Sequence, residues 1–478
     1  MQRGMMKQIC RVDQGRLVPR FVSRRLGVVF LVLLACAGCA TQGGARDAAG
    51  ANDLTATPGK TSATAADSRE SDDDRAAVAP YPIDNPLLAT VLGTPAKLKA
   101  PLPDDAPITL RTLDPLVQRD TPDTLRYARP LQYMFTPQDG PAPLAFVIAG
   151  TGASALSSKC VLLSRALYAD GYSVACLPSP TSVTFMLGAA EYPVPGRMKT
   201  DVDDLYRMMG AVRDDLSDQI DITGYALTGW SLGATEAAFV AHKDASAGQF
   251  DFQHVLLLNP AVSVWDSVAR MDALLDRTLP GGIDQVPSFL AKGLGGLKDV
   301  YAKNKALRFN EDFLYQAYQS GAADQNDIGA LVGLAFRLSL ANMAYAADVI
   351  TRSDVIVPKN VTPGPYSDMR PYFRRAFDMS FNDYINELLV PYWNSDGRHV
   401  PKSTLIREAD LHQIAGFLAN SDNIAVFTNA DDPILSDDEV AFLSRTFGAR
   451  ARIRPHGGHM GNLSYDKTIR ALQDFFSP

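Results

Sequence analysis

A short apolar segment, Tyr225 to Thr228, leads directly into Gly229-Trp230-Ser231-Leu232-Gly233, and a helical pattern follows over Ala234 to Ala241. This order predicts a serine held in a tight turn between a buried strand and a helix. Glycines flank the serine because such a turn leaves no room for a Cβ atom. The turn raises the hydroxyl above the sheet, and the N-terminus of the helix faces negative charge that develops there. Ser231 is therefore the candidate nucleophile.

Other apolar segments bounded by turn residues predict buried strands. These segments are Leu144 to Ala149, Ser173 to Leu177, Val255 to Leu258, Ile424 to Thr428 and Ala451 to Arg454. Apolar residues at helical spacing occupy Leu156 to Ala169, Lys199 to Leu216, Asp437 to Thr446 and Tyr465 to Phe476. Strands that alternate with helices predict an α/β fold, with a mostly parallel sheet flanked by helices.

The alternation stops after Asn259-Pro260, and helical patterns dominate from 262 to 415. This region predicts a large helical cap inserted into a core formed by 81–261 and 416–478.

One cap segment, Ile328 to Ile350, has nearly the length and apolar character of a membrane span. It contains Arg337, Asn342 and Asp348, and charged side chains are costly in hydrocarbon. A buried cap helix is the favoured interpretation.

A serine hydroxyl is a weak nucleophile unless a general base removes its proton. Of the six histidines, His459 is the best candidate because it lies in a glycine-rich loop, Gly457 to Gly461, between the last predicted strand and helix. The imidazole can turn toward the serine from such a loop. His456 is the alternative base, and otherwise has a structural role.

The imidazole in turn needs a carboxylate that fixes its tautomer. Asp431 and Asp432 directly follow the strand at Ile424 to Thr428, and Asp432 is preferred, whereas Asp431 can cap the loop. The preceding strand ends at Asn259-Pro260 without a carboxylate. The triad hypothesis is Ser231, Asp432 and His459, in that chain order.

Two backbone N–H groups must stabilise the tetrahedral oxyanion. One is expected from Leu232, directly after the nucleophile. The other is expected from the loop Gly150 to Ala153, with Thr151 as the first candidate and Gly152 as the alternative. The Rossmann spacing and the P-loop lysine are absent, which disfavours a phosphate cradle here.

Three motifs together resemble the α/β-hydrolase superfamily: G-W-S-L-G at 229–233, N-A-D-D-P at 429–433 and G-G-H-M-G-N at 457–462. The resemblance covers roughly 144–478, with the cap matching only as a helical insertion. One departure is Ala149-Gly150, where the family usually has His-Gly. The resemblance implies acyl transfer to water through an acyl-enzyme, without a metal or organic cofactor, and points to an exported bacterial branch of the superfamily.

The N-terminus predicts an export signal. Basic residues from Arg3 to Arg25 precede an apolar run, Leu26 to Ala35, that is shorter than the roughly twenty residues of a membrane span. Ala37-Gly38-Cys39 then resembles the end of a bacterial lipobox. Cys39 is the expected site of lipidation by acyl chains such as palmitate, and Cys36 is the competing position. Two acyl chains give stable anchoring.

Residues 1–39 thus form the predicted signal peptide and lipobox, and 40–80 form a predicted disordered tether. The tether is rich in Ala, Thr, Ser, Gly and Asp, so it cannot bury enough apolar surface to order itself. Downstream, Cys160 and Cys176 lie near the same end of a helix and a neighbouring strand. A disulfide and two buried thiols both remain open for this pair.

The formal net charge of -7 argues against nucleic acid as a partner. The expected function is hydrolysis of a carboxylic ester, of a lipid or lysophospholipid type, in the cell envelope at the periplasmic side of the outer membrane. A peptidase, an amidase or an acyltransferase of the same fold is one alternative, and a catalytically silent scaffold protein is another. The sequence does not give the oligomeric state.

Overall fold

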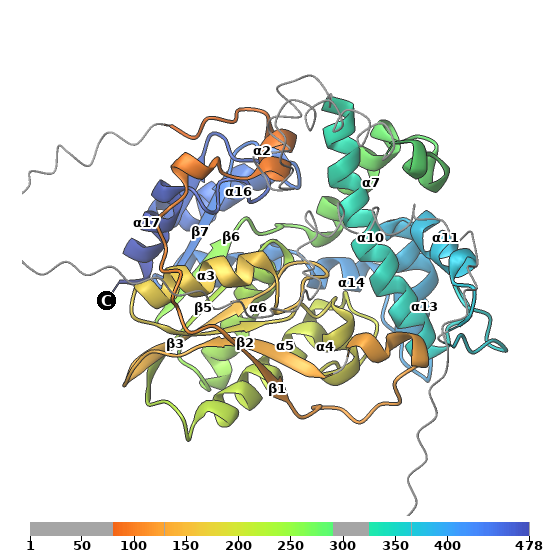
Figure 1. The fold of residues 1–478 in the computed structure, drawn as a ribbon, viewed down its shortest axis with the longest axis horizontal. Coiled ribbons are helices and arrows are strands. Elements are labelled where there is room, and N and C mark those ends of the chain that lie inside the picture. Colours follow the sequence, from red (N-terminus) through yellow and green to blue (C-terminus); the bar gives the residue numbers. More distant parts are fainter. Residues whose placement is uncertain (1–79, 129, 290–324, 365, 478) are drawn as a thin grey trace, which may run out of the picture.

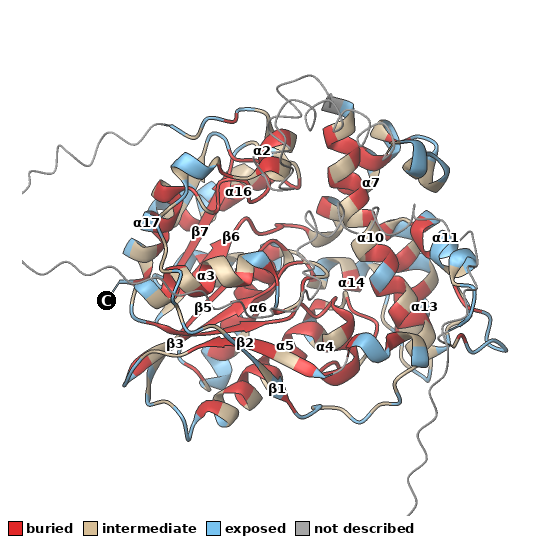
Figure 2. Cartoon of the chain, viewed as in Figure 1, coloured by how far each residue is buried: buried red, intermediate tan, exposed pale blue. Residues whose placement is uncertain are grey.

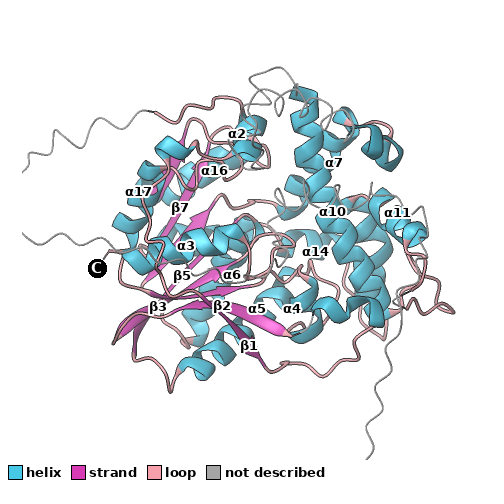
Figure 3. Cartoon of the chain, in the orientation of Figure 1, coloured by secondary structure: helices cyan, strands magenta, loops and turns pink. Residues whose placement is uncertain are grey.

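The computed structural model describes residues 80–128, 130–289, 325–364 and 366–477. The predicted signal peptide, the lipidation candidates Cys36 and Cys39, and the predicted tether up to 79 lie outside the described residues. An eight-stranded sheet forms the centre of the described part, with helices on both faces (Figure 3).

The strands are β1 (Thr109–Leu113), β2 (Leu131–Thr136), β3 (Ala142–Ile148), β4 (Ser173–Leu177), β5 (Ile222–Trp230), β6 (His254–Leu258), β7 (Ile424–Asn429) and β8 (Ala451–Arg454). Their spatial order is β1-β2-β4-β3-β5-β6-β7-β8. β2 pairs antiparallel with β1 and β4, and all other neighbours pair in parallel. This order is that of the α/β-hydrolase fold, and the predicted fold class is confirmed.

Five longer helices cover the sheet: α3 (Ser158–Ala169), α5 (Met198–Leu216), α6 (Leu232–Ala247), α16 (Asp437–Phe447) and α17 (Asp466–Phe476). Residues of β3 alternate between two buried clusters. Phe146 packs in the cluster that contains residues of α5 and α6, whereas Val147 packs with residues of α3 and α17. Both sheet faces are therefore buried, which explains why the central strands are continuously apolar (Figure 2).

Two short helices precede or interrupt this pattern, α2 (Pro86–Leu92) and α4 (Val183–Gly188). Single 3-10 turns occupy Ala96–Leu98, Asp123–Ala128, Gly282–Gln285, Leu411–Ile414 and Gly448–Arg450.

The described chain between β6 and β7 is helical and contains no strand. It forms α7 (Val264–Thr278), α10 (Gln325–Thr351), α11 (Arg370–Asp378), α12 (Phe381–Asp383), a π-helical turn (Tyr384–Leu389), α13 (Val390–Trp393), α14 (Lys402–Glu408) and α15 (Ala415–Asn420). Residues of α7, α10 and α11 share a separate buried cluster with Phe381, Tyr384 and Trp393. These helices lie beside the sheet (Figure 1).

Within the described residues, one helix is long and apolar enough to span a membrane. Asn326–Thr351 has a mean hydropathy of 1.4, and 61% of the window is buried inside the protein. The Arg337 guanidinium pairs with Asp272 of α7 at 2.8 Å, and both side chains are largely buried. Burial against α7 and α11 agrees with the interpretation of Ile328 to Ile350 as a cap helix.

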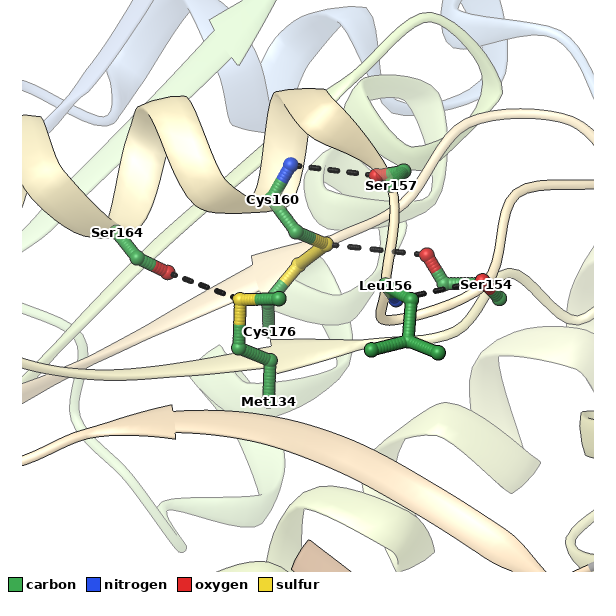
Figure 4. The surroundings of a disulfide bond; sticks show 7 residues. All are labelled: Met134, Ser154, Leu156, Ser157, Cys160, Ser164 and Cys176. Atoms are coloured by element: carbon green, nitrogen blue, oxygen red, sulfur yellow. Dashed lines mark hydrogen bonds between the residues drawn. A yellow bond between two sulfur atoms is a disulfide. The ribbon is translucent and has the colours of Figure 1, made fainter. Parts of the chain in front are cut away.

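Cys160 and Cys176 form a disulfide, with their Cα atoms 5.9 Å apart (Figure 4). Cys160 lies in the first turn of α3, and Cys176 lies near the end of β4. Of the two states that the sequence leaves open, the structure has the bridged one. The Cys160 N–H donates to Ser157 Oγ at 3.2 Å, so Ser157 caps the start of α3. The disulfide therefore links this capped helix start, which follows the loop after β3, to the end of β4.

Candidate active site

Ser231 lies between the end of β5 and the start of α6, at φ 57° and ψ −127°. Its N–H donates to the carbonyl oxygen of Leu258 at 2.9 Å, which fixes the turn against β6. A Cβ atom on Gly229 would approach Gly233 O to 2.2 Å, and one on Gly233 would approach Ile148 O to 2.3 Å. The two glycines are therefore sterically required, because both close contacts are with backbone atoms.

The three side chains of the triad hypothesis lie in one hydrogen-bonded row. His459 Nε2 is 2.9 Å from Ser231 Oγ, and His459 Nδ1 is 3.1 and 3.0 Å from the two carboxyl oxygens of Asp432. A carboxylate can only accept, so Nδ1 carries the proton and Nε2 accepts from the serine hydroxyl. All three side chains are buried.

Asp432 has further donors besides the imidazole. Asn259 Nδ2 donates to Asp432 Oδ2 at 2.7 Å, and the Ile434 N–H donates to Oδ1 at 3.1 Å. A buried carboxylate is costly unless its oxygens are hydrogen-bonded, and here both oxygens are. Asn259 itself, directly after β6, adopts φ 48°, and its N–H donates to the carbonyl oxygen of Phe427 in β7 at 2.8 Å.

The loop after β3 is held by a polar segment after β4. The Gly152 N–H donates to Thr181 Oγ1 at 2.7 Å, and Thr181 Oγ1 is 2.8 Å from Ser179 Oγ. Gly152, the alternative oxyanion donor, is therefore already engaged. Within the described ranges, no acceptor is found for the N–H of Thr151 or of Leu232. These two groups remain available as donors.

His456 and Asp431, the two alternatives to the triad members, lie next to each other and away from this row. His456 Nδ1 is 3.5 Å from Asp431 Oδ2, and the His456 side chain is 47% exposed. Asp431 accepts from the N–H groups of Gly457 and Gly458 at 3.3 and 2.9 Å. Burial raises the pKa of Asp431, while the two glycine N–H groups and then His456 act in the opposite direction.

Helix α10 covers the site from the cap. Phe336 is 6.3 Å from the His459 ring, measured between ring centroids. A Cβ on Gly152 would lie 3.2 Å from Ser339 Cβ, so the same helix also touches the loop after β3. Ser231 is 8% exposed and His459 is 9% exposed. Ser231 is thus enclosed between the sheet edge and an apolar cap helix.

Two surface cavities lie elsewhere, and neither is lined by a residue of the row. One, of about 500 Å³, is lined by residues of α5, α6 and α14, including Lys199, Phe239 and Arg407. A neighbouring cavity of about 250 Å³ includes Tyr192 and Trp393. In the part of the chain that the structure describes, no group of three or more His, Cys, Asp or Glu side chains is arranged to hold a metal ion.

Sequence reasoning missed the supporting residues Asn259 and Thr181. Asn259 directly follows the predicted strand Val255 to Leu258, and its position after that strand is the signal that could have found it, since β6 pairs with the strand that precedes Asp432. Thr181 offers no such signal, because its contact with Gly152 depends on how β3 and β4 pair in parallel.

No protein-family model matches the chain, and no curated protein sequence matches it. Among solved structures, the chain is similar to an esterase from Pseudomonas putida, at 15% identity and a TM-score of 0.36, covering 81% of this chain and 86% of that one. It is also similar to an esterase from Pyrobaculum calidifontis, at 14% identity and a TM-score of 0.38, covering 79% and 87%. A Rhizomucor miehei esterase has 15% identity and a TM-score of 0.38, covering 78% and 84%. At such identities and scores the likeness does not bear on function.

Proposed function

We propose that this protein is a serine hydrolase that cleaves carboxylic esters through an acyl-enzyme. The observation that carries the proposal is the row Ser231 Oγ, His459 Nε2, His459 Nδ1 and Asp432, with contacts of 2.9 to 3.1 Å. A nucleophile within hydrogen-bond reach of a base, which is itself oriented by a third group, is the arrangement that activates a hydroxyl.

In the first step, Ser231 Oγ attacks the ester carbonyl carbon while His459 Nε2 takes the hydroxyl proton. The carbonyl π electrons move to the oxygen, and the N–H groups of Thr151 and Leu232 stabilise the resulting oxyanion. When the intermediate collapses, the bond to the leaving alcohol breaks, and His459 donates the proton to that alcohol. A water molecule then attacks the carbonyl carbon of the acyl-enzyme while His459 takes its proton. The bond to Ser231 Oγ breaks, His459 returns the proton to Oγ, and the carboxylic acid is released. Asp432 stabilises the imidazolium throughout.

We further propose a lipid or lysophospholipid type of ester as substrate. Two observations support an apolar acyl group: Phe336 of the cap helix stands beside the imidazole, and the serine is almost fully enclosed. An enclosed site also excludes bulk water from the ground state, which strengthens the oxyanion contacts.

The first experiment is covalent labelling with a fluorophosphonate probe. Wild-type protein is expected to label, and Ser231→Ala is expected to lose all labelling because the nucleophilic oxygen is gone. Ser164→Ala is the matched control, since Ser164 is also fully buried but lies on α3. Absence of labelling in the wild type, or equal labelling in Ser231→Ala, would contradict the serine mechanism.

The second experiment compares p-nitrophenyl esters of increasing chain length with matching anilides, and lysophospholipids with water-soluble esters. A lipid-type substrate predicts that kcat/KM rises with acyl length and that esters exceed anilides. A labelled enzyme that prefers anilides would replace the esterase assignment by an amidase, and one that transfers its acyl group to an added alcohol would be an acyltransferase.

We also propose that Cys39 carries lipid and anchors the protein in the cell envelope, on the periplasmic side of the outer membrane. The support is the sequence alone: an apolar run, then Ala37-Gly38-Cys39, with Ala40 following. Metabolic labelling with an alkyne fatty acid tests this directly. Cys39→Ser is expected to lose the label and Cys36→Ser to keep it. The reverse result would move the lipid to Cys36.

A further inference from the structure

The short helix α2 belongs to neither the sheet nor the cap, yet it contacts the loop that carries His459. Its first turn is capped by Asn85, whose Oδ1 accepts from the Leu88 N–H at 2.9 Å. In Figure 1, α2 (orange) lies next to the C-terminal part of the chain near α16 (blue). Residues far apart in the sequence are therefore neighbours at the candidate site.

Thr90 makes the contact to the histidine itself. Its Oγ1 accepts the backbone N–H of His459 at 2.8 Å and donates to the carbonyl oxygen of Pro86 at 2.7 Å. The hydroxyl proton is thus used within α2, so the lone pairs of the oxygen are oriented toward the loop. In the described residues, Thr90 Oγ1 is the acceptor of the His459 backbone N–H.

The backbones of α2 and the loop approach so closely that side chains are excluded. A Cβ on Gly458, which has φ 54°, would lie 2.0 Å from Pro86 O. A Cβ on Gly461 would lie 2.1 Å from Ala89 O. Thr94 Oγ1 also donates to Gly461 O at 3.0 Å, in a buried position. The loop is therefore in close contact with α2 and with Thr94, two residues beyond it, on both sides of His459.

The opposite side of α2 packs on the cap. Leu88, Ala89 and Leu92 form a buried cluster with Ile328 of α10, and Leu87 and Leu331 pack against this cluster. Helix α10 is also the helix that carries Phe336 toward the imidazole. α2 is thus held by apolar contacts that do not involve the loop.

From these contacts we infer that Thr90 is a positioning residue for His459. Through Thr90, α2 fixes the position of the imidazole between Ser231 and Asp432. This inference rests on the proposed function of the triad. Without the Thr90 hydroxyl, the N–H of the buried His459 loses its acceptor, and the loop must shift to satisfy it. Because catalysis depends on the alignment of the base, such a shift lowers the rate of proton transfer rather than substrate binding.

The test compares Thr90→Val, which keeps the side-chain shape without the hydroxyl, with Thr90→Ser, which keeps the hydroxyl. Thr90→Val is expected to lower kcat with p-nitrophenyl esters by about ten- to a hundredfold at unchanged KM. Thr90→Ser is expected to stay close to the wild type. Thr278→Val on α7 is the matched control: Thr278 also donates to its own helix, to Leu274 O at 2.8 Å, and does not contact the triad.

A second variant distinguishes a loss of positioning from a folding defect. Thr90→Ala also lacks the hydroxyl, but alanine favours the helix more than threonine does. A loss of kcat shared by Thr90→Val and Thr90→Ala, with cooperative thermal unfolding retained and Thr278→Val fully active, supports the positioning role. Wild-type kcat in either hydroxyl-free variant, or a Thr278→Val variant that loses as much, would overturn it.

A readout that needs no substrate separates this inference from the proposed function. The proton on His459 Nδ1, hydrogen-bonded to Asp432, gives a downfield NMR resonance that can be assigned by its loss in His459→Ala. It is expected to be shifted or lost in Thr90→Val and kept in Thr90→Ser. If the wild type neither labels nor hydrolyses any ester, the proposed function fails. The resonance still decides on Thr90, because an unchanged signal in Thr90→Val contradicts the inference.

Discussion

Two histidine–aspartate pairs lie within a few residues of each other in this protein, and their surroundings differ sharply. His459 and Asp432 are buried and 3.0 Å apart, and His459 Nε2 is 2.9 Å from Ser231 Oγ. His456 and Asp431 are 3.5 Å apart, and their side chains are 47% and 16% exposed. The same two residue types therefore serve two purposes on neighbouring positions of the same two loops.

The difference lies in what else the carboxylates bind. Asp432 accepts from Asn259, from Ile434 and from His459 Nδ1, and this last contact directs His459 Nε2 at the serine. Asp431 instead accepts from the N–H groups of Gly457 and Gly458, and thereby shapes the loop that carries His459. The first pair has the arrangement that the proposed proton transfer requires, and the second pair shapes the loop.

The largest contrast is expected at the histidines. Replacing His459 by alanine removes the base, and kcat is expected to fall by about a millionfold in steady-state ester hydrolysis. Fluorophosphonate labelling is expected to slow in parallel. A His459→Ala enzyme that retains substantial activity would show that the buried pair is not the proton-transfer pair.

Asp432→Asn is expected to lower kcat by about ten-thousandfold, because an amide favours the wrong imidazole tautomer. The binding groups are untouched, so KM changes little. The measurement is a full kinetic comparison on one ester, with the downfield His459 proton as a structural check. Activity near the wild-type level would assign the acid role to a different carboxylate.

Asp431→Asn is expected to act mainly on stability, because the amide oxygen keeps only part of the two glycine contacts. Loss of one such hydrogen bond predicts a melting temperature lower by about 2–4 °C, with activity reduced only modestly.

The effect also depends on pH, because burial raises the pKa of Asp431 in the folded protein. A raised pKa means that the folded state holds the proton more tightly than the unfolded state does. The contribution of protonated Asp431 to the free energy of unfolding is therefore full below the carboxyl pKa of the unfolded chain, about 4. It is lost as the pH rises through the raised pKa of the folded protein. The gap in melting temperature between wild type and Asp431→Asn should narrow as the pH rises. A gap that widens would contradict this direction.

His456→Ala is expected to have the smallest effect. The side chain is half exposed and its contact to Asp431 is long, so kcat/KM and stability should change by no more than about twofold and half a kcal/mol respectively. A large loss of kcat here, at unchanged stability, would remove the distinction between the two pairs.

Hydrophobic pattern was enough to predict the buried centre of this fold. β4 and β8 begin and end at the predicted residues, and β3, β5, β6 and β7 differ from their predicted limits by only a few positions. β1 and β2 were not predicted. β1 is mostly exposed and has the sequence T-L-R-T-L, so it lacks the continuous apolar run by which the central strands were identified.

The candidate site likewise contains residues that the sequence predicts and residues that it does not. Ser231, Asp432 and His459 could be proposed because each follows a strand whose end is visible in the sequence, and the structure brings the three together. Asp431 and Asp432 are adjacent in the sequence, and their different hydrogen-bond partners distinguish them in the structure. Thr90 could not have been found, since its contact with His459 joins segments at opposite ends of the chain.

The docking of α2 on the histidine loop has a consequence for how the site can be lost. Thr90 and His459 are 369 positions apart in the sequence, and α2 belongs to no strand pairing of the sheet. Local unfolding of this one short helix would therefore leave the His459 N–H without its acceptor while the central sheet stays paired.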